Sequence, residues 1–149
     1  MGITIVLLAH VAATLFMTGL IWYVQVVHYP LFRLADPARF AQFEADHSRF
    51  TARVVVPPML VEFATAVVLV IVPHPILPLP LAWIGFALLV VVWWSTWALQ
   101  VPMHVVLTDG YDEAAHDRLV RTNWIRTIGW TLRSALLFTV IGKLLLQHS

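Results

Sequence analysis

The sequence contains no cysteine among its 149 residues. Disulfides, thiolate metal ligands and cysteine nucleophiles are therefore excluded. Charged residues are also scarce, since they make up 11% of the chain, against about 25% in soluble domains. No basic tract is present and the net charge is only +1, so we expect no nucleic-acid partner. These absences exclude an ordinary soluble domain.

The residues that are present are mostly apolar. Hydrophobic types make up 60% of the chain and the mean hydropathy is +0.84. We therefore predict an all-α integral membrane protein that lies in a lipid bilayer, with one domain over residues 1–149. The apolar runs indicate a bundle of four transmembrane helices, at about residues 3–28, 54–72, 80–107 and 122–146. The first run lacks a basic leader and a small-residue cleavage site, so we expect it to stay as a span.

The connection between the first two spans has a mixed character. Asp36 followed by Pro37 is typical of a helix start. Apolar and aromatic side chains then recur at 3-4-3 spacing: Phe40, Phe43, His47 and Phe50. This pattern predicts an amphipathic interfacial helix at about residues 36–52, or the extended start of the second span.

Two proline positions suggest helix boundaries. Tyr29 precedes Pro30, and the residue before proline is disfavoured in the α conformation, so we expect the first helix to end there. The pair Pro57-Pro58 predicts a kink or a new helix start in the second span.

The distribution of arginine predicts an orientation. The first-to-second and third-to-fourth connections carry the arginines, and the second-to-third connection carries no Lys or Arg. The positive-inside rule then places both charged connections in the cytoplasm and both termini on the outer side. We expect a bacterial cytoplasmic membrane. The arginines in question are Arg33, Arg39, Arg49, Arg53, Arg118 and Arg121.

Polar residues converge at the same leaflet. They end the first and third spans and begin the second and fourth: Gln25, His28, Glu62, Gln100, His104, Asn123 and Arg126. In the third span a 4-3-4 spacing puts Trp93, Trp97, Gln100 and His104 on one helical face. The first span has a seam at 4-3-4-4-3 spacing: His10, Thr14, Met17, Ile21, Gln25 and His28.

Two kinds of cofactor site fit these residues. Histidines with a carboxylate suit a mononuclear Fe, Cu or Zn site, and the candidate ligands are His28, Glu44, His47, Glu62 and His104. Glu44 and His47 form a Glu-x-x-His pair that shares a helix face. Haem is the rival cofactor, with His10, His28 or His104 as axial ligand.

The candidate catalytic residues are His28 and His104, as metal ligands or acid/base groups, with Glu62 as their carboxylate partner. The candidate substrate-binding residues are Gln25, Trp93, Trp97, Gln100, Asn123 and Arg126. Structural roles remain open beside these. Gln25 and Gln100 could join helices by hydrogen bonds, and Glu62 could form a buried pair with Arg133. We expect His74, His116 and His148 to be exposed and assign them no role.

Two parts of the C-terminal half carry a family resemblance: Gln100-Val101-Pro102-Met103-His104 through Leu119, and Thr122-Asn123-Trp124-Ile125-Arg126-Thr127 with Trp130-Thr131-Leu132-Arg133. They resemble small bacterial four-helix membrane proteins of unknown function, similar in layout to the anthrone-oxygenase-like family. That family has V-P-x-N and W-x-x-x-N-x-x-R elements. His104 stands at or near the asparagine of the first, and residues 123–126 match the second loosely. The resemblance implies an oxygenase-like or other small-molecule role.

A shorter stretch resembles another family. Leu8-Ala9-His10 followed by Gly19 is similar to the first span of the membrane protoporphyrinogen oxidases, which bind haem, although no lysine completes that pattern.

The leading function hypothesis is a membrane oxidoreductase that acts on a hydrophobic small molecule near the cytoplasmic leaflet. One alternative is a non-enzymatic protein that binds or carries haem, lipid or an ion, and a carrier would need the seam of the first span to be wet along its length. Another is a structural accessory subunit. Association into a homo-oligomer through tryptophan-rich faces is open.

Overall fold

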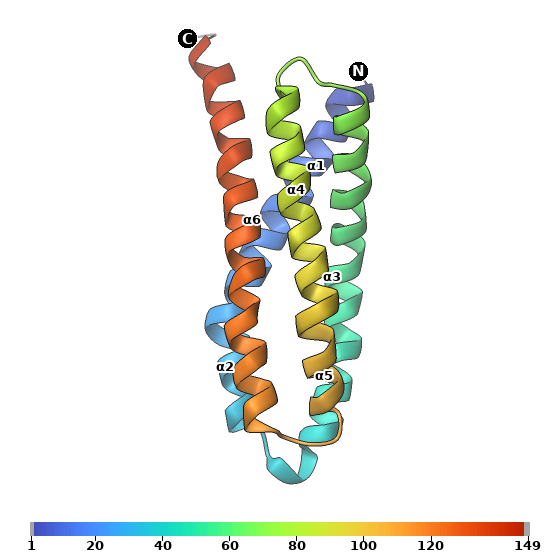
Figure 1. Ribbon diagram of the computed structural model, residues 1–149, viewed down its shortest axis with the longest axis vertical. Coiled ribbons are helices and arrows are strands. Elements are labelled where there is room, and N and C mark those ends of the chain that lie inside the picture. The colour runs from blue at the N-terminus through green and yellow to red at the C-terminus, as the bar shows by residue number, and fades with distance from the viewer. Residues whose placement is uncertain (1, 148–149) are drawn as a thin grey trace.

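A computed structural model describes residues 2–147, without the side chains of 143–145 and 147. These residues form long antiparallel helices and contain no β-strand (Figure 1). The elements in chain order are α1 Gly2–Tyr23, η1 Val24–His28, α2 Tyr29–Leu31, η2 Phe32–Leu34, η3 Pro37–Arg39, α3 Phe40–Ile71, α4 Leu79–Ser95, η4 Thr96–Gln100, α5 Val101–Leu107 and α6 Glu113–Gln147. The all-α prediction is confirmed.

Three of the described helical segments are long and apolar enough to cross a membrane: Gly2–Leu34, Pro37–Ile71 and Leu79–Leu107. The long helix α6 packs against α1 and α4, and α3 packs against α1 and α4. Large apolar side chains cover the outside of the bundle, and Trp97 is 74% exposed. Such a surface is disfavoured in water and suits lipid, so the prediction of an integral membrane protein agrees with the fold.

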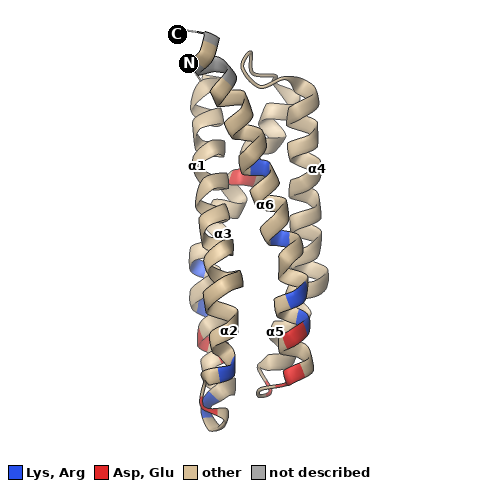
Figure 2. Ribbon diagram, turned by 90° about the vertical axis from the view of Figure 1, so that its left-hand side faces the viewer, with Lys and Arg blue, Asp and Glu red and all other residues tan. Residues whose placement is uncertain are grey.

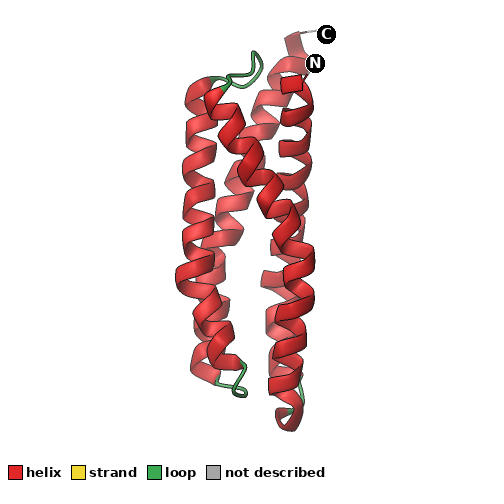
Figure 3. Ribbon diagram, turned by 90° about the vertical axis from the view of Figure 1, so that its right-hand side faces the viewer, coloured by secondary structure: helices red, strands yellow, loops and turns green. Residues whose placement is uncertain are grey.

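The charged residues are distributed unevenly along the length of the bundle (Figure 2). Both described ends of the chain lie at one end, and the short helices α2 and α5 lie at the other (Figure 1). Most charged residues gather towards the α2 and α5 end, and a few lie halfway along the bundle (Figure 2). The loops lie at the ends of the bundle (Figure 3).

The first helix does not end at Pro30, so that prediction is wrong. The chain stays helical to Leu34 because a π turn, η1, lies just before the proline. The Tyr29 N–H donates to the Val24 carbonyl, five residues back, which widens the turn. Proline cannot donate to the carbonyl four residues back and its ring crowds that carbonyl, and a wider turn relieves the crowding.

The third span repeats this arrangement. The π turn η4 ends two residues before Pro102, as η1 ends two residues before Pro30. The Val101 N–H donates to the Thr96 carbonyl, again five residues back. Each π turn adds one residue to the helix, which rotates the downstream residues by about 100° relative to a regular α-helix. π turns are frequent at functional sites.

The second span and the segment before it form one helix. α3 runs without interruption from Phe40 to Ile71 and passes through Pro57 and Pro58. A separate interfacial helix at residues 36–52 is therefore not formed, and the alternative, an extended start of the second span, is what the structure shows. At 1.5 Å per residue α3 is about 48 Å long, whereas a hydrocarbon core is about 30 Å thick. One end of α3 must project beyond the core.

The apolar core has two parts, with a polar layer between them. The larger part includes Met17, Met59 and Trp130, and the smaller part, nearer the chain ends, includes Leu7 and Leu69. Between them α1, α3 and α6 contribute polar side chains at one level: His10, Thr14, Glu62 and Arg133.

Candidate functional site

Three potential metal ligands meet where α3 lies against α5. Glu44, His47 and His104 each offer one ligand atom, and these atoms lie within 4.8 Å of one another. Glu44 and His47 are three residues apart on α3, so their side chains leave the same helix face. His104 comes from α5, just after the second π turn. The Glu-x-x-His pair is thus completed by a histidine from a distant part of the chain.

The Glu44 carboxylate is buried and only half satisfied. Its Oε1 accepts from His104 Nδ1 at 2.6 Å and from the Ser48 hydroxyl at 3.0 Å. Its Oε2 has no hydrogen-bond partner among the described residues, and the side chain is fully buried. An unpaired carboxylate oxygen on a fully buried side chain is costly, so the position favours a cationic ligand.

The first π turn brings two adjacent side chains to this cluster. His28 Nε2 lies 2.8 Å from His47 Nδ1, and the Tyr29 hydroxyl lies 3.1 Å from His104 Nε2. Thr51, one turn along α3, also contacts His47 Nδ1 at 3.1 Å. His28 therefore lies beside the cluster through His47, and Tyr29 holds the far side of the His104 ring.

A cavity of about 390 Å³ opens beside the cluster. His47, His104, Tyr29 and Arg126 line it with polar atoms, and most of the remaining wall is apolar. The apolar wall is made by Met17, Leu20, Ile21, Val24, Ala52, Val55, Val101 and Val105. A largely apolar cavity with a few convergent polar groups is the usual form of a small-molecule site.

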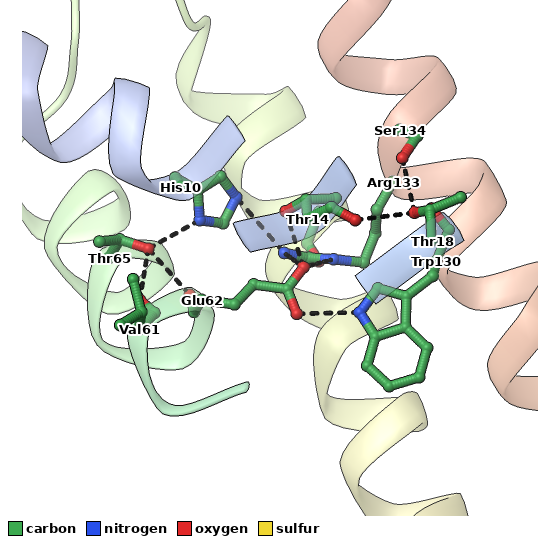
Figure 4. A network of polar contacts seen from close by, with 10 residues as sticks. His10, Thr14, Thr18, Val61, Glu62, Thr65, Trp130, Arg133 and Ser134 are labelled. Atoms are coloured by element: carbon green, nitrogen blue, oxygen red, sulfur yellow. Dashed lines mark hydrogen bonds and ion pairs between the residues drawn. The ribbon is translucent and has the colours of Figure 1, made fainter. Parts of the chain in front are cut away.

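Glu62 does not belong to this site, although it was expected as the carboxylate partner of the histidines. It lies 18 residues beyond Glu44 on the continuous helix α3, about 27 Å along the axis. Its partners are in the polar layer at the middle of the bundle (Figure 4). The interrupted helix that the sequence suggested would have allowed Glu62 to approach the charged end. The structure puts Glu44 in that place.

The Glu62 carboxylate is instead fully hydrogen-bonded. Its Oε1 accepts from Thr14 at 2.7 Å and from Arg133 Nε at 3.1 Å, and its Oε2 accepts from Trp130 Nε1 at 2.9 Å. Arg133 also donates to the Gly85 carbonyl and contacts His10 Nε2 at 3.3 Å. The other His10 nitrogen lies 2.9 Å from the Thr65 hydroxyl. The structural alternative, a buried pair of Glu62 and Arg133, is therefore observed (Figure 4).

Three predicted substrate contacts join helices to one another. Asn123 donates to Gln25 Oε1 at 2.9 Å, and Gln25 donates to the Val120 carbonyl at 3.2 Å. Gln100 accepts from Ser95 at 3.1 Å and donates to Thr122 at 3.1 Å. All three are buried and none lines the cavity.

The predicted polar face of the third span is rotated by its π turn. Trp97 points to the outside of the bundle, whereas Gln100 is buried. Ser95 and Gln100, five residues apart, share the inner face and are hydrogen-bonded to each other. Trp93 packs on Phe63 with ring centroids 5.6 Å apart. Neither tryptophan lines this cavity, and both line a separate open pocket together with Phe63 and Trp94.

Two further histidines, His74 and His116, are not exposed as expected. His74 is buried in the 72–78 loop, where its Nδ1 accepts from the Ile76 N–H at 3.1 Å. His116 is buried too, and its Nε2 donates to the Tyr29 carbonyl at 2.8 Å. His148 lies outside the described residues. The first-span seam, in contrast, faces inward at His10, Thr14, Met17, Ile21 and Gln25.

Sequence reasoning missed the role of Tyr29. Its place before Pro30 suggested a helix end, and the residue was given no part in the site. Its position directly after His28, a candidate ligand, was the available signal.

Comparison of the chain with protein-family models, curated proteins and solved structures finds no match. The resemblance to the anthrone-oxygenase-like family therefore stays a prediction, and the function must be argued from the site.

Proposed function

We propose that the protein is a membrane-embedded, metal-dependent oxidoreductase of the oxygenase type that acts on a hydrophobic small molecule. The metal ligands are Glu44, His47 and His104, with His28 beside them. The observation that carries the proposal is the convergence of these three ligand atoms within 4.8 Å at the wall of an apolar cavity.

The donor set fits a redox metal. Two histidines and one carboxylate form the ligand set of non-haem Fe(II) oxygenases, which leaves open positions for oxygen and substrate. The fully buried Glu44 has an unpartnered Oε2, which a metal ion would satisfy. His28 contacts His47, and Tyr29 contacts His104, so both ring ligands are oriented by neighbours.

The cavity indicates how the chain would serve such a reaction. A non-haem iron centre activates molecular oxygen, the oxidant that this chemistry requires. The apolar wall would exclude water and hold the body of a hydrophobic substrate, while Tyr29 and Arg126 offer hydrogen bonds to its polar end. Both histidines of the donor set line the same cavity, so substrate and metal would be neighbours.

The membrane arrangement that we propose has four spans, with α6 as the fourth. Both termini then lie on the outer side and the arginine-rich end lies in the cytoplasm. In this arrangement the charged end of α3 would project beyond the hydrocarbon core, with the metal ligands near the cytoplasmic leaflet of a bacterial membrane.

The alternatives have less support. A carrier needs a wet path along the first span, but Met17 and Ile21 lie in the apolar core between Thr14 and Gln25. As a haem ligand His10 is poorly suited, because the cavity that it lines has a volume of only about 20 Å³.

Metal analysis of protein purified in non-ionic detergent tests the proposal. We expect one Fe per protein chain in the purified protein. Titration of metal-free protein with Co²⁺ should instead give the visible absorption of an ion bound by nitrogen and oxygen ligands. His104→Ala should abolish both signals while circular dichroism shows a folded bundle. His74→Ala is the matched control, because His74 is buried at the opposite end, and it should keep the metal. A Soret band, or metal retained by His104→Ala, would overturn the proposal.

A further inference from the structure

The cavity contains a cation for which the described residues supply no anion. Arg126 lies on α6, is 6% exposed and lines the cavity wall. Among the described residues no carboxylate forms an ion pair with it, whereas Arg33, Arg49 and Arg133 each have one. Its Nε is buried with no hydrogen-bond partner.

The neighbours of Arg126 satisfy it only in part. Its guanidinium carbon lies 5.4 Å from the centre of the Trp130 ring, and the Tyr29 hydroxyl is a polar neighbour. An aromatic face and a phenol are weak partners for a charge that is removed from water. A buried arginine that serves structure alone is normally paired, as Arg133 is with Glu62.

We infer that the substrate is an acidic amphiphile, a small hydrophobic molecule with one carboxylate or phenolate that pairs with Arg126. This inference rests on the proposed function in calling the bound molecule a substrate. The binding that it predicts needs no metal. A guanidinium offers two parallel N–H groups to a carboxylate, and such charge-assisted bonds are strong when water is excluded.

The geometry also places the anion relative to the metal ligands. The Tyr29 hydroxyl contacts His104 and lies beside Arg126, so a single side chain separates the anion site from the ligand cluster. A substrate held by its acidic group on Arg126 would therefore present the adjoining part of its body to the metal. The cavity volume of about 390 Å³ lies at the low end for ligand pockets.

Binding of two probes of equal chain length tests the inference. Decanoate and decanol are titrated by calorimetry into metal-free protein in non-ionic detergent at about pH 8, where a carboxyl group is ionised. We expect decanoate to bind about ten- to a hundredfold more tightly than decanol, as for a charged hydrogen bond formed in a dry site. Arg126→Met should remove this preference by weakening the binding of decanoate far more than that of decanol. Arg126→Lys should keep part of the preference.

Controls separate charge from folding and from metal binding. Arg121→Met removes an exposed arginine five residues away on the same helix and should leave the decanoate preference intact. Arg126→Met should fold, because it removes an unpaired buried charge, and thermal unfolding checks this. Equal binding of both probes by the wild type, or a preference that survives Arg126→Met, would refute the inference. If the wild type binds metal but shows no preference for decanoate, the anion site is refuted and the proposed function stands. If it prefers decanoate but binds no metal, the proposed function is refuted and the anion site stands.

Discussion

Replacing Glu62 by glutamine tests whether the polar layer is structural. The substitution keeps the shape of the side chain but removes the only carboxylate paired with Arg133 among the described residues. Glu62 is fully buried and its carboxylate accepts from Thr14, Trp130 and Arg133. In Glu62→Gln the amide nitrogen faces N–H donors and the Arg133 charge is left uncompensated.

The expected cost comes from this burial. Arg133 is 2% exposed, so water cannot replace the lost partner. Removal of one member of a buried ion pair costs about 3–5 kcal/mol in the free energy of unfolding. The double variant Glu62→Gln with Arg133→Met removes both charges and keeps an acceptor for Trp130. It should recover most of that loss, with a coupling energy of about 2 kcal/mol or more.

Equilibrium unfolding with SDS in mixed micelles, followed by circular dichroism, gives these free energies. Asp117→Asn is the control, because it breaks the Arg33–Asp117 pair, whose side chains are 56% and 47% exposed. That loss should stay below about 1 kcal/mol. Glu62→Gln should also leave metal affinity unchanged, since Glu62 lies about 27 Å from Glu44 along α3. A Glu62→Gln cost as small as the control, or lost metal binding, would refute the reasoning.

Two further predictions concern the helix α6. A Cβ on Gly129 would lie 2.6 Å from a Val92 methyl group, and valine is stiff in a helix, so Gly129→Ala should destabilise the bundle by about 1–3 kcal/mol through overpacking. A thermal shift near zero would contradict this. Asp112 Oδ1 accepts from the Ala115 N–H at 2.7 Å as a helix cap, so Asp112→Ala should cost about 1 kcal/mol in the same unfolding assay. Loss of metal or probe binding in Asp112→Ala would instead indicate a role in the site.

Local patterns accounted for the class of fold and for part of the packing. Long apolar runs predict helices because a bilayer offers backbone groups no hydrogen-bond partner. The 4-3-4-4-3 seam identified the buried face of the first span, from His10 to Gln25, because a regular helix brings such positions to one side. The Glu44-x-x-His47 spacing placed two of the three clustered ligands for the same reason.

Local patterns failed where the helix departs from 3.6 residues per turn. A π turn adds one residue and rotates the rest of the helix, so the expected face of Trp97, Gln100 and His104 was divided between lipid and core. The prolines suggested boundaries at Pro30 and at Pro57-Pro58, but both helices continue through them. Hydrogen bonds and packing from other helices can outweigh such local preferences.

The sequence alone therefore determined the apolar helices, the uneven distribution of charge, and the supply of histidines and carboxylates near one end. Only the tertiary structure decided which carboxylate meets which histidine. Glu44 lies in the charged segment of α3 and Glu62 in its apolar part, but neither context names a partner, and the structure puts one beside His104 and pairs the other with Arg133. The choice depends on the continuity of α3 and on the register of three helices, and both are properties of packing between distant segments.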